Sequence, residues 1–240
     1  MIRPRRLEAL DASPAAVRRR TPVHRLWYAA YGSNMHLDRL TAYLAGGRPP
    51  GGLRSYPGCR DPSGPARTAP VMLPGLLYFA TESDVWTGGR AFYDPDAKPA
   101  DHPGRQPHEP AELPARAYLL TLSQFSDIAA QEMYREPGAD LDPTEAVTRG
   151  RSRLGPGRYE TLVCAGLLDG YPVLTFTAPW RSEDVAGNPP SAAYLRHIVA
   201  GIVASHGWSV QQAGAYLAGC PGADGHWTAS GIAALLSAPP

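Results

Sequence analysis

The residues best placed to do chemistry form a short turn in the first fifth of the chain. Residues 27–36 read Trp-Tyr-Ala-Ala-Tyr-Gly-Ser-Asn-Met-His. The apolar run over residues 26–31 has the length and aromatic content of a buried strand. It stops at Gly32, Ser33 and Asn34, a cluster suited to a sharp turn with strained or left-handed backbone. A strand, a small-residue turn and a helix N-terminus together offer free backbone N–H groups, which can receive a carboxylate or a developing oxyanion. An ordinary strand-to-helix corner is the alternative.

A helix is predicted directly after this turn, with Ser33 or Asn34 as its N-cap. Its apolar positions fall near one face and its polar positions on the other. The apolar set is Met35, Leu37, Leu40 and Leu44, and the polar set is Asp38 and Arg39. The glycine- and proline-rich residues 45–50 should end this helix.

A second chemical group is the carboxylate of Glu132. Residues 115–122 read as a strand, and Ser123 stands where the N-cap of a following helix belongs. In that helix, residues 123–133, Glu132 lies one turn after Ile128 and therefore on the inward face. A carboxylate there is either exposed at a fraying helix end or has a functional role.

A pair of glycines lies between two further predicted strands. Residues 76–80 read as a strand, and residues 86–93 run Trp-Thr-Gly-Gly-Arg-Ala-Phe-Tyr into another. Gly88 and Gly89 would let backbone approach a ligand closely. A β-bulge or a tight hairpin would explain them equally well.

The second half of the chain continues in the same mixed pattern. Asp169-Gly170 is a strong hairpin signal between strands predicted at 161–168 and 172–178. Ser191 is a good N-cap for a helix that runs to Gly207.

These blocks, taken in order, resemble the γ-glutamylcyclotransferase family. The matching segments are Tyr31-Gly32-Ser33-Asn34-Met35, Trp86-x-Gly88-Gly89, the strand and helix ending in Glu132, Gly157-x-Tyr159, and Pro189-Pro190-Ser191-x-x-Tyr194. The resemblance covers roughly residues 26–208. It implies an α+β fold, a twisted, partly closed mixed sheet surrounded by helices. It also implies an enzyme that cuts γ-glutamyl amides by intramolecular cyclisation and releases 5-oxoproline and an amine.

The resemblance assigns roles to particular residues. Glu132 takes the place of the catalytic glutamate, which removes the proton of the substrate's ammonium group and returns it to the leaving amine. The implied substrate-binding residues are Tyr31, Gly32, Ser33, Asn34, Met35, Trp86, Gly88, Gly89 and Tyr159. No metal or organic cofactor is implied. The sequence departs from the family at Met133, where glycine is usual, so the turn after the glutamate is open to question.

Other functions compete with this interpretation. Ser33 could be the nucleophile of a serine amidase, but the sequence around it is not a Gly-x-Ser-x-Gly elbow and no His–Asp partner is evident. A metal-dependent deacylase would need histidines at the spacing of metal ligands, and none of the seven histidines shows that spacing. A non-catalytic module that binds a small molecule or a protein on the same fold remains an alternative, because a fold does not fix a function. An acyltransferase or amidase acting on a related γ-glutamylated metabolite also remains.

Composition narrows the setting. The formal charge of +1 over 240 residues gives no general reason to expect nucleic acid as a partner. The sequence has no apolar run of about 18 residues, so no membrane span is expected. The N-terminal residues lack the apolar region of a secretory signal. Three widely spaced cysteines favour a reducing cytoplasm over a disulfide framework or a zinc site.

The chain is expected to divide into three parts. Residues 1–25 carry seven arginines and are predicted to be a basic flexible leader, residues 26–208 form the main domain, and residues 209–240 add two short helices packed on it. Relative to the family, 94–114 and 134–156 are long insertions, and the second is a candidate lid. His102 and His108 in the first match no metal-ligand spacing. The two insertions favour a large γ-glutamylated amine as substrate, while the leaving amine and the oligomeric state are not determined.

Overall fold

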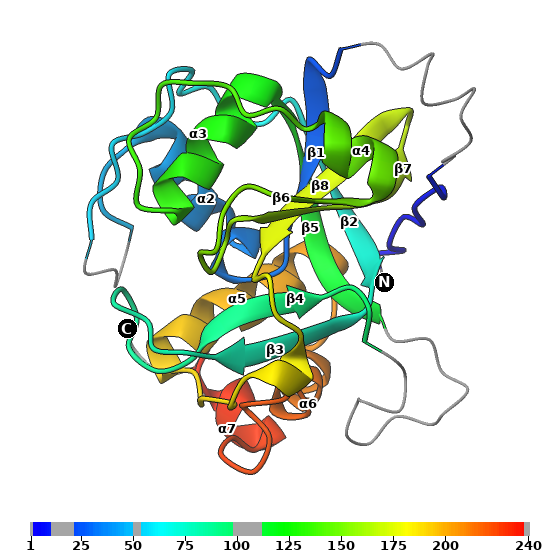
Figure 1. Ribbon diagram of the computed structural model, residues 1–240. Coiled ribbons are helices and arrows are strands. Elements are labelled where there is room, and N and C mark those ends of the chain that lie inside the picture. The colour runs from blue at the N-terminus through cyan, green and yellow to red at the C-terminus, as the bar shows by residue number, and fades with distance from the viewer. Residues whose placement is uncertain (1, 11–21, 50–53, 98–111, 238–240) are drawn as a thin grey trace.

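The structure is a computed structural model, and it describes residues 2–10, 22–49, 54–97 and 112–237. Its largest element is a six-stranded mixed sheet with helices packed around it (Figure 1). The predicted α+β fold on a mixed sheet is therefore confirmed. His102 and His108 lie outside the described residues.

The sheet has the strand order β2-β5-β1-β8-β7-β6. The bounds in that order are Arg67–Pro74, Glu112–Thr121, Arg25–Ala30, Tyr171–Thr177, Thr161–Leu168 and Arg151–Arg153. β1 and β8 are parallel, and the other neighbours are antiparallel. A separate two-stranded sheet pairs β3 (Leu76–Ala80) with β4 (Arg90–Asp94).

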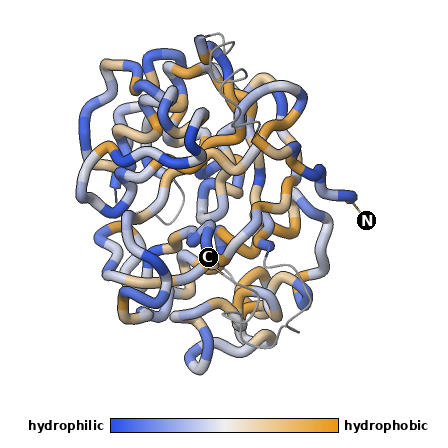
Figure 2. Tube along the Cα trace, turned by 45° about the vertical axis from the view of Figure 1, so that its right-hand side comes forward, coloured by the Kyte–Doolittle hydropathy of each residue, from blue (hydrophilic) through white to orange (hydrophobic). Residues whose placement is uncertain are grey.

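β1 lies in the middle of the large sheet and forms the centre of the core. Its residues 26–30 are all buried, as expected for a strand with neighbours on both edges and packing on both faces. The Tyr28 ring stacks on Phe176 of β8 at 5.3 Å between ring centres and meets Phe125 at 5.7 Å. In Figure 2 the hydrophilic positions gather in several of the peripheral loops.

Helices and 3₁₀ turns connect and cover these strands. They are η1 (Ser33–Met35), α2 (Leu37–Ala45), α3 (Leu122–Glu132), α4 (Thr144–Arg149), η3 (Ser182–Asp184), α5 (Ala192–His206), α6 (Val210–Ala218) and α7 (Ala229–Ala234). α3 packs against β1 and β5, and α5 packs against β2, β5 and η1. A Cβ atom on Gly201 of α5 would lie 2.5 Å from the Cβ of Met35. Glycine at this position therefore allows α5 to approach the turn after β1 closely.

Two helices begin at residues other than those predicted. α2 has His36 as its N-cap residue, because residues 33–35 form a 3₁₀ turn of their own. α3 is capped by Thr121 in place of Ser123, and Thr121 and Gln124 form a reciprocal capping box. Ser191 caps α5 as predicted, and its side chain accepts a hydrogen bond from the Tyr194 amide.

The polarity of α2 is also different from the prediction. Arg39 is buried at 3% exposure, whereas Leu37 is 38% exposed. The amphipathic pattern misplaces Arg39 because aromatic side chains of the core, Tyr43 and Tyr56 among them, surround its guanidinium group.

The β7–β8 hairpin confirms the Asp169-Gly170 signal. Both residues have positive φ, 51° and 77°, as a two-residue turn between twisted strands requires. Asp169 also accepts hydrogen bonds from Arg5 and Arg67, so the turn holds two basic side chains.

Residues 2–10 lie along the sheet, which differs from the predicted flexible leader. Arg5 N–H donates to Pro70 O at 2.8 Å, and Glu8 exchanges two backbone hydrogen bonds with Leu167. A Cβ atom on Gly166 would lie 2.5 Å from Glu8 O, so the glycine at the β7 bulge makes room for this pairing.

Residues beyond 208 are part of the same core. α6 and α7 pack on each other and on α5, and Leu217, Cys220 and Ile232 are fully buried. Phe79 of β3 donates its amide proton to Pro221 O at 2.8 Å. The C-terminal segment thus covers β3 directly.

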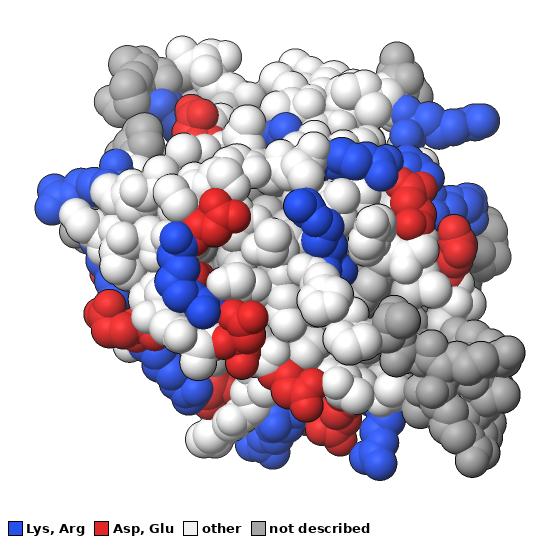
Figure 3. Space-filling view, turned by 90° about the horizontal axis from the view of Figure 1, so that it is seen from above, with Lys and Arg blue, Asp and Glu red and all other residues white. Residues whose placement is uncertain are grey.

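The surface carries charges of both signs. On the face shown in Figure 3, arginines and acidic residues are interspersed. Among the described residues, no helix is both long and apolar enough to cross a bilayer.

His206, the last residue of α5, generates a prediction about pH. Its side chain is fully buried, Nε2 donates to Val71 O at 3.2 Å, and burial lowers its pKa from the ordinary 6.5. A lowered folded-state pKa means that the unfolded chain takes up the proton first, so stability is present above pH 6.5 and is lost as pH falls below it. We expect the thermal midpoint of the wild-type protein to fall more steeply between about pH 6.5 and 5 than that of His206→Gln. His24→Gln, at an exposed position, serves as the control and should follow the wild-type profile.

Candidate functional site

A single cavity collects most of the residues singled out by the sequence. Its wall is mainly aromatic: Tyr28, Tyr31, Tyr43, Tyr56, Trp86, Tyr134, Tyr159, Phe176 and Tyr194. The remaining wall residues are Gly32, Ser33, Asn34, Arg39, Ser83, Val85, Arg90, Ala91, Glu132 and Arg158. Among these described wall residues, Glu132 is the one carboxylate, and there is no histidine or cysteine.

The turn after β1 contains two backbone amides that its own hydrogen bonds do not use. Met35 N–H is bonded to Gly32 O and His36 N–H to Ser33 O, which closes the 3₁₀ turn η1. The amides of Ser33 and Asn34 precede these bonds, and no acceptor for them is found among the described residues. Strained or left-handed backbone was predicted for this turn, and Gly32, with a φ of −104°, does not adopt the left-handed form. Gly32 instead leaves room for the Tyr194 hydroxyl, which would lie 3.1 Å from a Cβ atom there.

The Asn34 side chain links this turn to the glutamate. Its Nδ2 donates to Glu132 Oε1 at 3.1 Å and to the Tyr28 hydroxyl at 3.2 Å. Its Oδ1 is buried and has no partner among the described residues. The amide therefore orients the carboxylate and keeps one acceptor oxygen unused.

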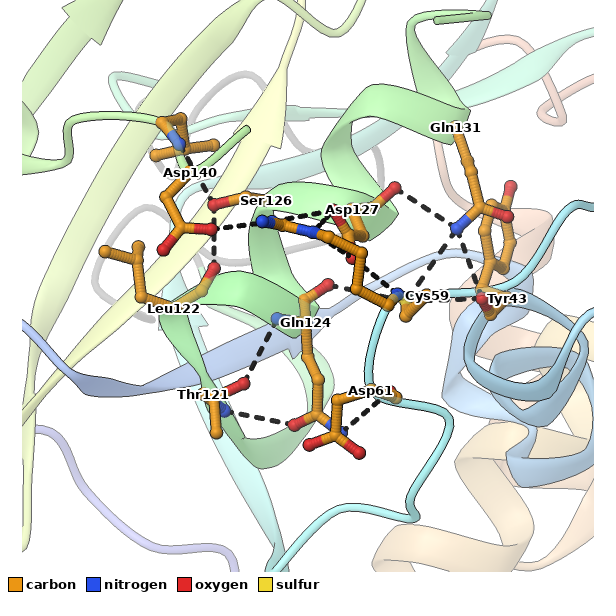
Figure 4. A network of polar contacts seen from close by, with 12 residues as sticks. Tyr43, Cys59, Asp61, Thr121, Leu122, Gln124, Ser126, Asp127, Gln131 and Asp140 are labelled. Carbon is orange, nitrogen blue, oxygen red and sulfur yellow. Dashed lines mark hydrogen bonds and ion pairs between the residues drawn. The ribbon is translucent and has the colours of Figure 1, made fainter. Parts of the chain in front are cut away.

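Glu132 is the last residue of α3, and a polar network holds that helix in place (Figure 4). Asp127 is fully buried and accepts hydrogen bonds from the backbone amide and the side chain of Arg60. Gln131 Nε2 donates to Tyr43 O at 3.1 Å, which joins α3 to α2. The end of α3, and with it Glu132, is thus fixed from two directions.

The turn after Glu132 forms without a glycine at position 133, where the resembled family usually has one. Met133 has an ordinary φ of −83°, and the positive φ of 58° falls on Tyr134. Tyr134 reaches the cavity wall, where the guanidinium groups of Arg54 and Arg158 lie 4.3 and 4.4 Å from its ring centre. In the rest of the insertion 134–156, α4 packs against β6 and β7.

Three tyrosines of the cavity stay neutral. Burial raises the pKa of Tyr28, Tyr43 and Tyr159 above the ordinary value, and the nearby Glu132 carboxylate raises each further. Neutral phenols can donate hydrogen bonds but cannot serve as bases at neutral pH. Within this wall, proton transfer is therefore left to Glu132.

Several predicted site residues meet in the cavity. Glu132, Tyr31, Gly32, Ser33, Asn34, Trp86 and Tyr159 all line it. Tyr31 and Tyr159 donate their hydroxyl protons to backbone carbonyls of Phe176 and Ala91, at 2.8 and 3.0 Å. These two rings are consequently held in fixed positions.

Met35, Gly88 and Gly89 do not line the cavity. Met35 is fully buried and packs on Gly201. A Cβ atom on Gly89 would lie 1.9 Å from Asn188 O, and one on Gly88 would lie 2.5 Å from Pro189 O. The glycine pair thus admits the 188–190 segment. Nearby, Trp86 packs against the rings of Tyr194 and His197 at 6.0 and 4.8 Å between ring centres.

Sequence reasoning missed part of the wall. It assigned none of Arg39, Tyr43, Tyr56 and Arg90 to the site, and it put Arg39 on the outer face of its helix. Arg39 lies four positions after Met35 and four before Tyr43, and this one-face spacing could have placed it inward. The aromatic environment itself could not be predicted, because it is created partly by Tyr56, which comes from an irregular segment. Burial of a cation among aromatic rings is a tertiary property.

Two other kinds of reactive group can be placed. Cys59 lies outside the cavity wall, and burial raises the pKa of its thiol to about 12, so it is not a thiolate at neutral pH. No group of three or more metal-ligating side chains is found in the described part of the chain.

No family model matches the chain. A curated relative, histone deacetylase 5 of Arabidopsis thaliana, is 31% identical over 229 residues, which cover 88% of this chain and 33% of the relative. The chain thus spans about a third of the length of the curated relative it matches.

Two solved structures are similar at low identity. A γ-glutamyl cyclotransferase matches with a TM-score of 0.42 and 15% identity over 87% of this chain and 95% of that one. An uncharacterized protein from Homo sapiens matches with a TM-score of 0.44 and 16% identity over 90% of this chain and 99% of that one.

The network on α3 predicts an asymmetry between the two carboxylates that bind Arg60. We expect Asp127→Asn to lower the free energy of unfolding by about 1–3 kcal/mol, because it disrupts hydrogen bonds to a buried charged group. Asp140→Asn, at the exposed end of the same arginine, should cost less than about 1 kcal/mol. Urea denaturation of both variants measures the two free energies of unfolding. Equal losses would contradict the prediction that the buried Arg60–Asp127 pair stabilises the fold more than the exposed Arg60–Asp140 pair.

Proposed function

We propose that this protein cleaves γ-glutamyl amides by intramolecular cyclisation, releasing 5-oxoproline and an amine. The observation that carries the proposal is the position of Glu132. It is the one carboxylate among the described residues of the cavity wall, and its Oε1 is bound by Asn34 of the Tyr-Gly-Ser-Asn turn. The resemblance that assigns a catalytic role to this glutamate and a binding role to this turn rests on the sequence alone. Asn34 and Glu132, 98 residues apart in the chain, are in hydrogen-bond contact, which supports the two roles together.

The reaction requires a base that later acts as an acid. The Glu132 carboxylate accepts a proton from the substrate's α-ammonium group, and the free amine attacks the γ-carbonyl carbon to close a five-membered ring. The protonated Glu132 then gives its proton to the nitrogen of the leaving amine as the γ-amide C–N bond breaks. The released amine also takes up the proton that the ring nitrogen loses on becoming the lactam N–H, so it departs as its ammonium form. Water is not consumed, and the carboxylate returns to its starting state. A positioned acid–base group of this kind contributes about 10²–10⁴-fold to the rate.

The γ-carbonyl oxygen acquires negative charge in the tetrahedral intermediate. The amides of Ser33 and Asn34 have no acceptor among the described residues, and both residues belong to the cavity wall. They are suited to bind that oxygen, and the loss of one such donor typically costs roughly 3 kcal/mol of transition-state stabilisation. Aromatic side chains around them limit access of water, which strengthens these hydrogen bonds.

The alternative is a non-catalytic module that binds a small molecule in the same cavity. Incubation of the protein with a panel of γ-glutamyl amides, with chromatographic detection of 5-oxoproline, separates the two functions. Binding of these amides without any release of 5-oxoproline would favour the binding module.

Glu132→Gln is the decisive substitution. The change keeps the shape of the side chain and removes the group that accepts and returns the proton, so we expect 5-oxoproline release to fall by at least about 10²-fold. The melting temperature should stay within a few degrees or rise, because a neutral amide is less costly to bury than a carboxylate. Glu145→Gln, on the exposed side of α4, is the matched control and should retain activity.

A folded Glu132→Gln protein that retains more than about a tenth of the wild-type rate would contradict the assignment. If the variant does not fold, Glu132→Asp replaces it. That change keeps the charge but withdraws the carboxylate by one methylene from Asn34, so it should lower the rate while the cavity still binds 5-oxoproline.

A further inference from the structure

Arg39 is a buried cation whose nearby carboxylate, Glu132, acts on it electrostatically but forms no ion pair with it among the described residues. It is 3% exposed, and no ion pair involves it among the described residues. Its Nη2 donates to the hydroxyls of Tyr43 and Tyr56 at 3.2 and 2.6 Å. Its Nε and Nη1 are buried and have no hydrogen-bond partner in the described structure.

Such an arrangement is costly unless it has a use. Buried charges in proteins are normally paired with an opposite charge, and buried donors are normally hydrogen-bonded. The rings of Tyr43, Tyr56 and Trp86 lie 4.6, 4.5 and 5.6 Å from the guanidinium carbon and offset part of the cost. They supply no acceptor for Nε and Nη1. The planar fork of an arginine matches the two oxygens of a carboxylate.

The cavity also has unused acceptor capacity at Asn34. Asn34 Oδ1 has no partner among the described residues, and the Glu132 carboxylate lies beside this side chain. Arg39 and Glu132 both line the cavity, and both charges act on the Tyr43 hydroxyl, so the two groups lie near the same ring. A ligand that fits both groups carries a carboxylate and a nitrogen donor close together.

We propose that Arg39 binds the α-carboxylate of the γ-glutamyl substrate, so that Arg39, Asn34 and Glu132 together recognise a free amino-acid head group. This inference rests on the proposed function and deepens it. If Arg39 binds the α-carboxylate, the amides of Ser33 and Asn34 remain available to the γ-carbonyl oxygen. Without Arg39, the α-carboxylate and the γ-carbonyl oxygen would compete for the same two amides. The substrate class is therefore narrowed to γ-glutamyl amides whose α-carboxylate is unmodified.

The opposing interpretation is that Arg39 only ties Tyr43 and Tyr56 together. The two interpretations differ in what they predict for ligands, which makes a binding experiment more informative than loss of activity. 5-Oxoproline and 2-pyrrolidinone share the same lactam ring and differ only in the carboxylate. Isothermal titration calorimetry of both compounds measures the contribution of that group without turnover.

We expect the wild-type protein to bind 5-oxoproline about 10- to 100-fold more tightly than 2-pyrrolidinone, as hydrogen bonds to a charged group provide. Arg39→Met should abolish the preference. Arg39→Lys should retain a part of it, because it keeps the charge and loses the fork. Arg67→Met is the matched control, since Arg67 also lies over an aromatic ring, that of Trp27, but outside the cavity wall. It should keep the full preference.

Equal affinity of the wild-type protein for the two compounds would overturn the inference, as would the absence of binding by either. A preference that persists in Arg39→Met would overturn it as well. If Arg39→Met does not fold, the wild-type comparison and Arg39→Lys decide. A clear preference for 5-oxoproline in a protein that releases no 5-oxoproline from γ-glutamyl amides would leave the carboxylate site standing and reject the proposed function.

Discussion

The arrangement of the cavity depends on one hydrogen bond, from Asn34 Nδ2 to Glu132 Oε1. The bond joins the turn after the central strand to the end of α3, two elements that do not follow each other in the sequence. Glu132 is partly buried in an aromatic wall, where a carboxylate without a polar partner is costly. Asn34 is that partner and also ties the backbone amides beside it to the position of Glu132. The spacing between the carboxylate and these amides therefore depends on this contact, together with the hydrogen bonds that hold α3 in place.

The aromatic wall determines what the polar groups can do. Burial keeps the phenols of Tyr28 and Tyr159 neutral, so these two side chains exclude water without competing as bases. Electrostatic interactions among Glu132, Arg39 and a ligand act in a medium of low polarity, where they are stronger than in water. The cost of keeping Arg39 charged there explains why its surroundings consist of ring faces and hydroxyl groups.

Much of the fold could be predicted from the sequence, because its signals are local. The central strand, the Asp169-Gly170 hairpin and the Ser191 cap each depend on neighbouring residues. The inward position of Glu132 followed from the helical period. Failures arose where tertiary contacts decide. Arg39 is inside because of rings brought from other segments, and Gly89 is needed for the backbone at Asn188, not for a ligand in the cavity.

The pairing of β1 has a consequence for how the site comes into being. Tyr28 is paired with Tyr118 on one side and with Leu174 on the other, and the cavity wall extends to Tyr194. Contacts of such long sequence separation slow folding, because closing the loops between them costs conformational entropy before the contacts contribute any stabilising free energy. During synthesis one edge of the central strand therefore stays unpaired until β8 has been made, and no N-terminal fragment that ends before β8 contains a complete cavity. The wall of the site is complete only when the chain has been synthesised through Tyr194.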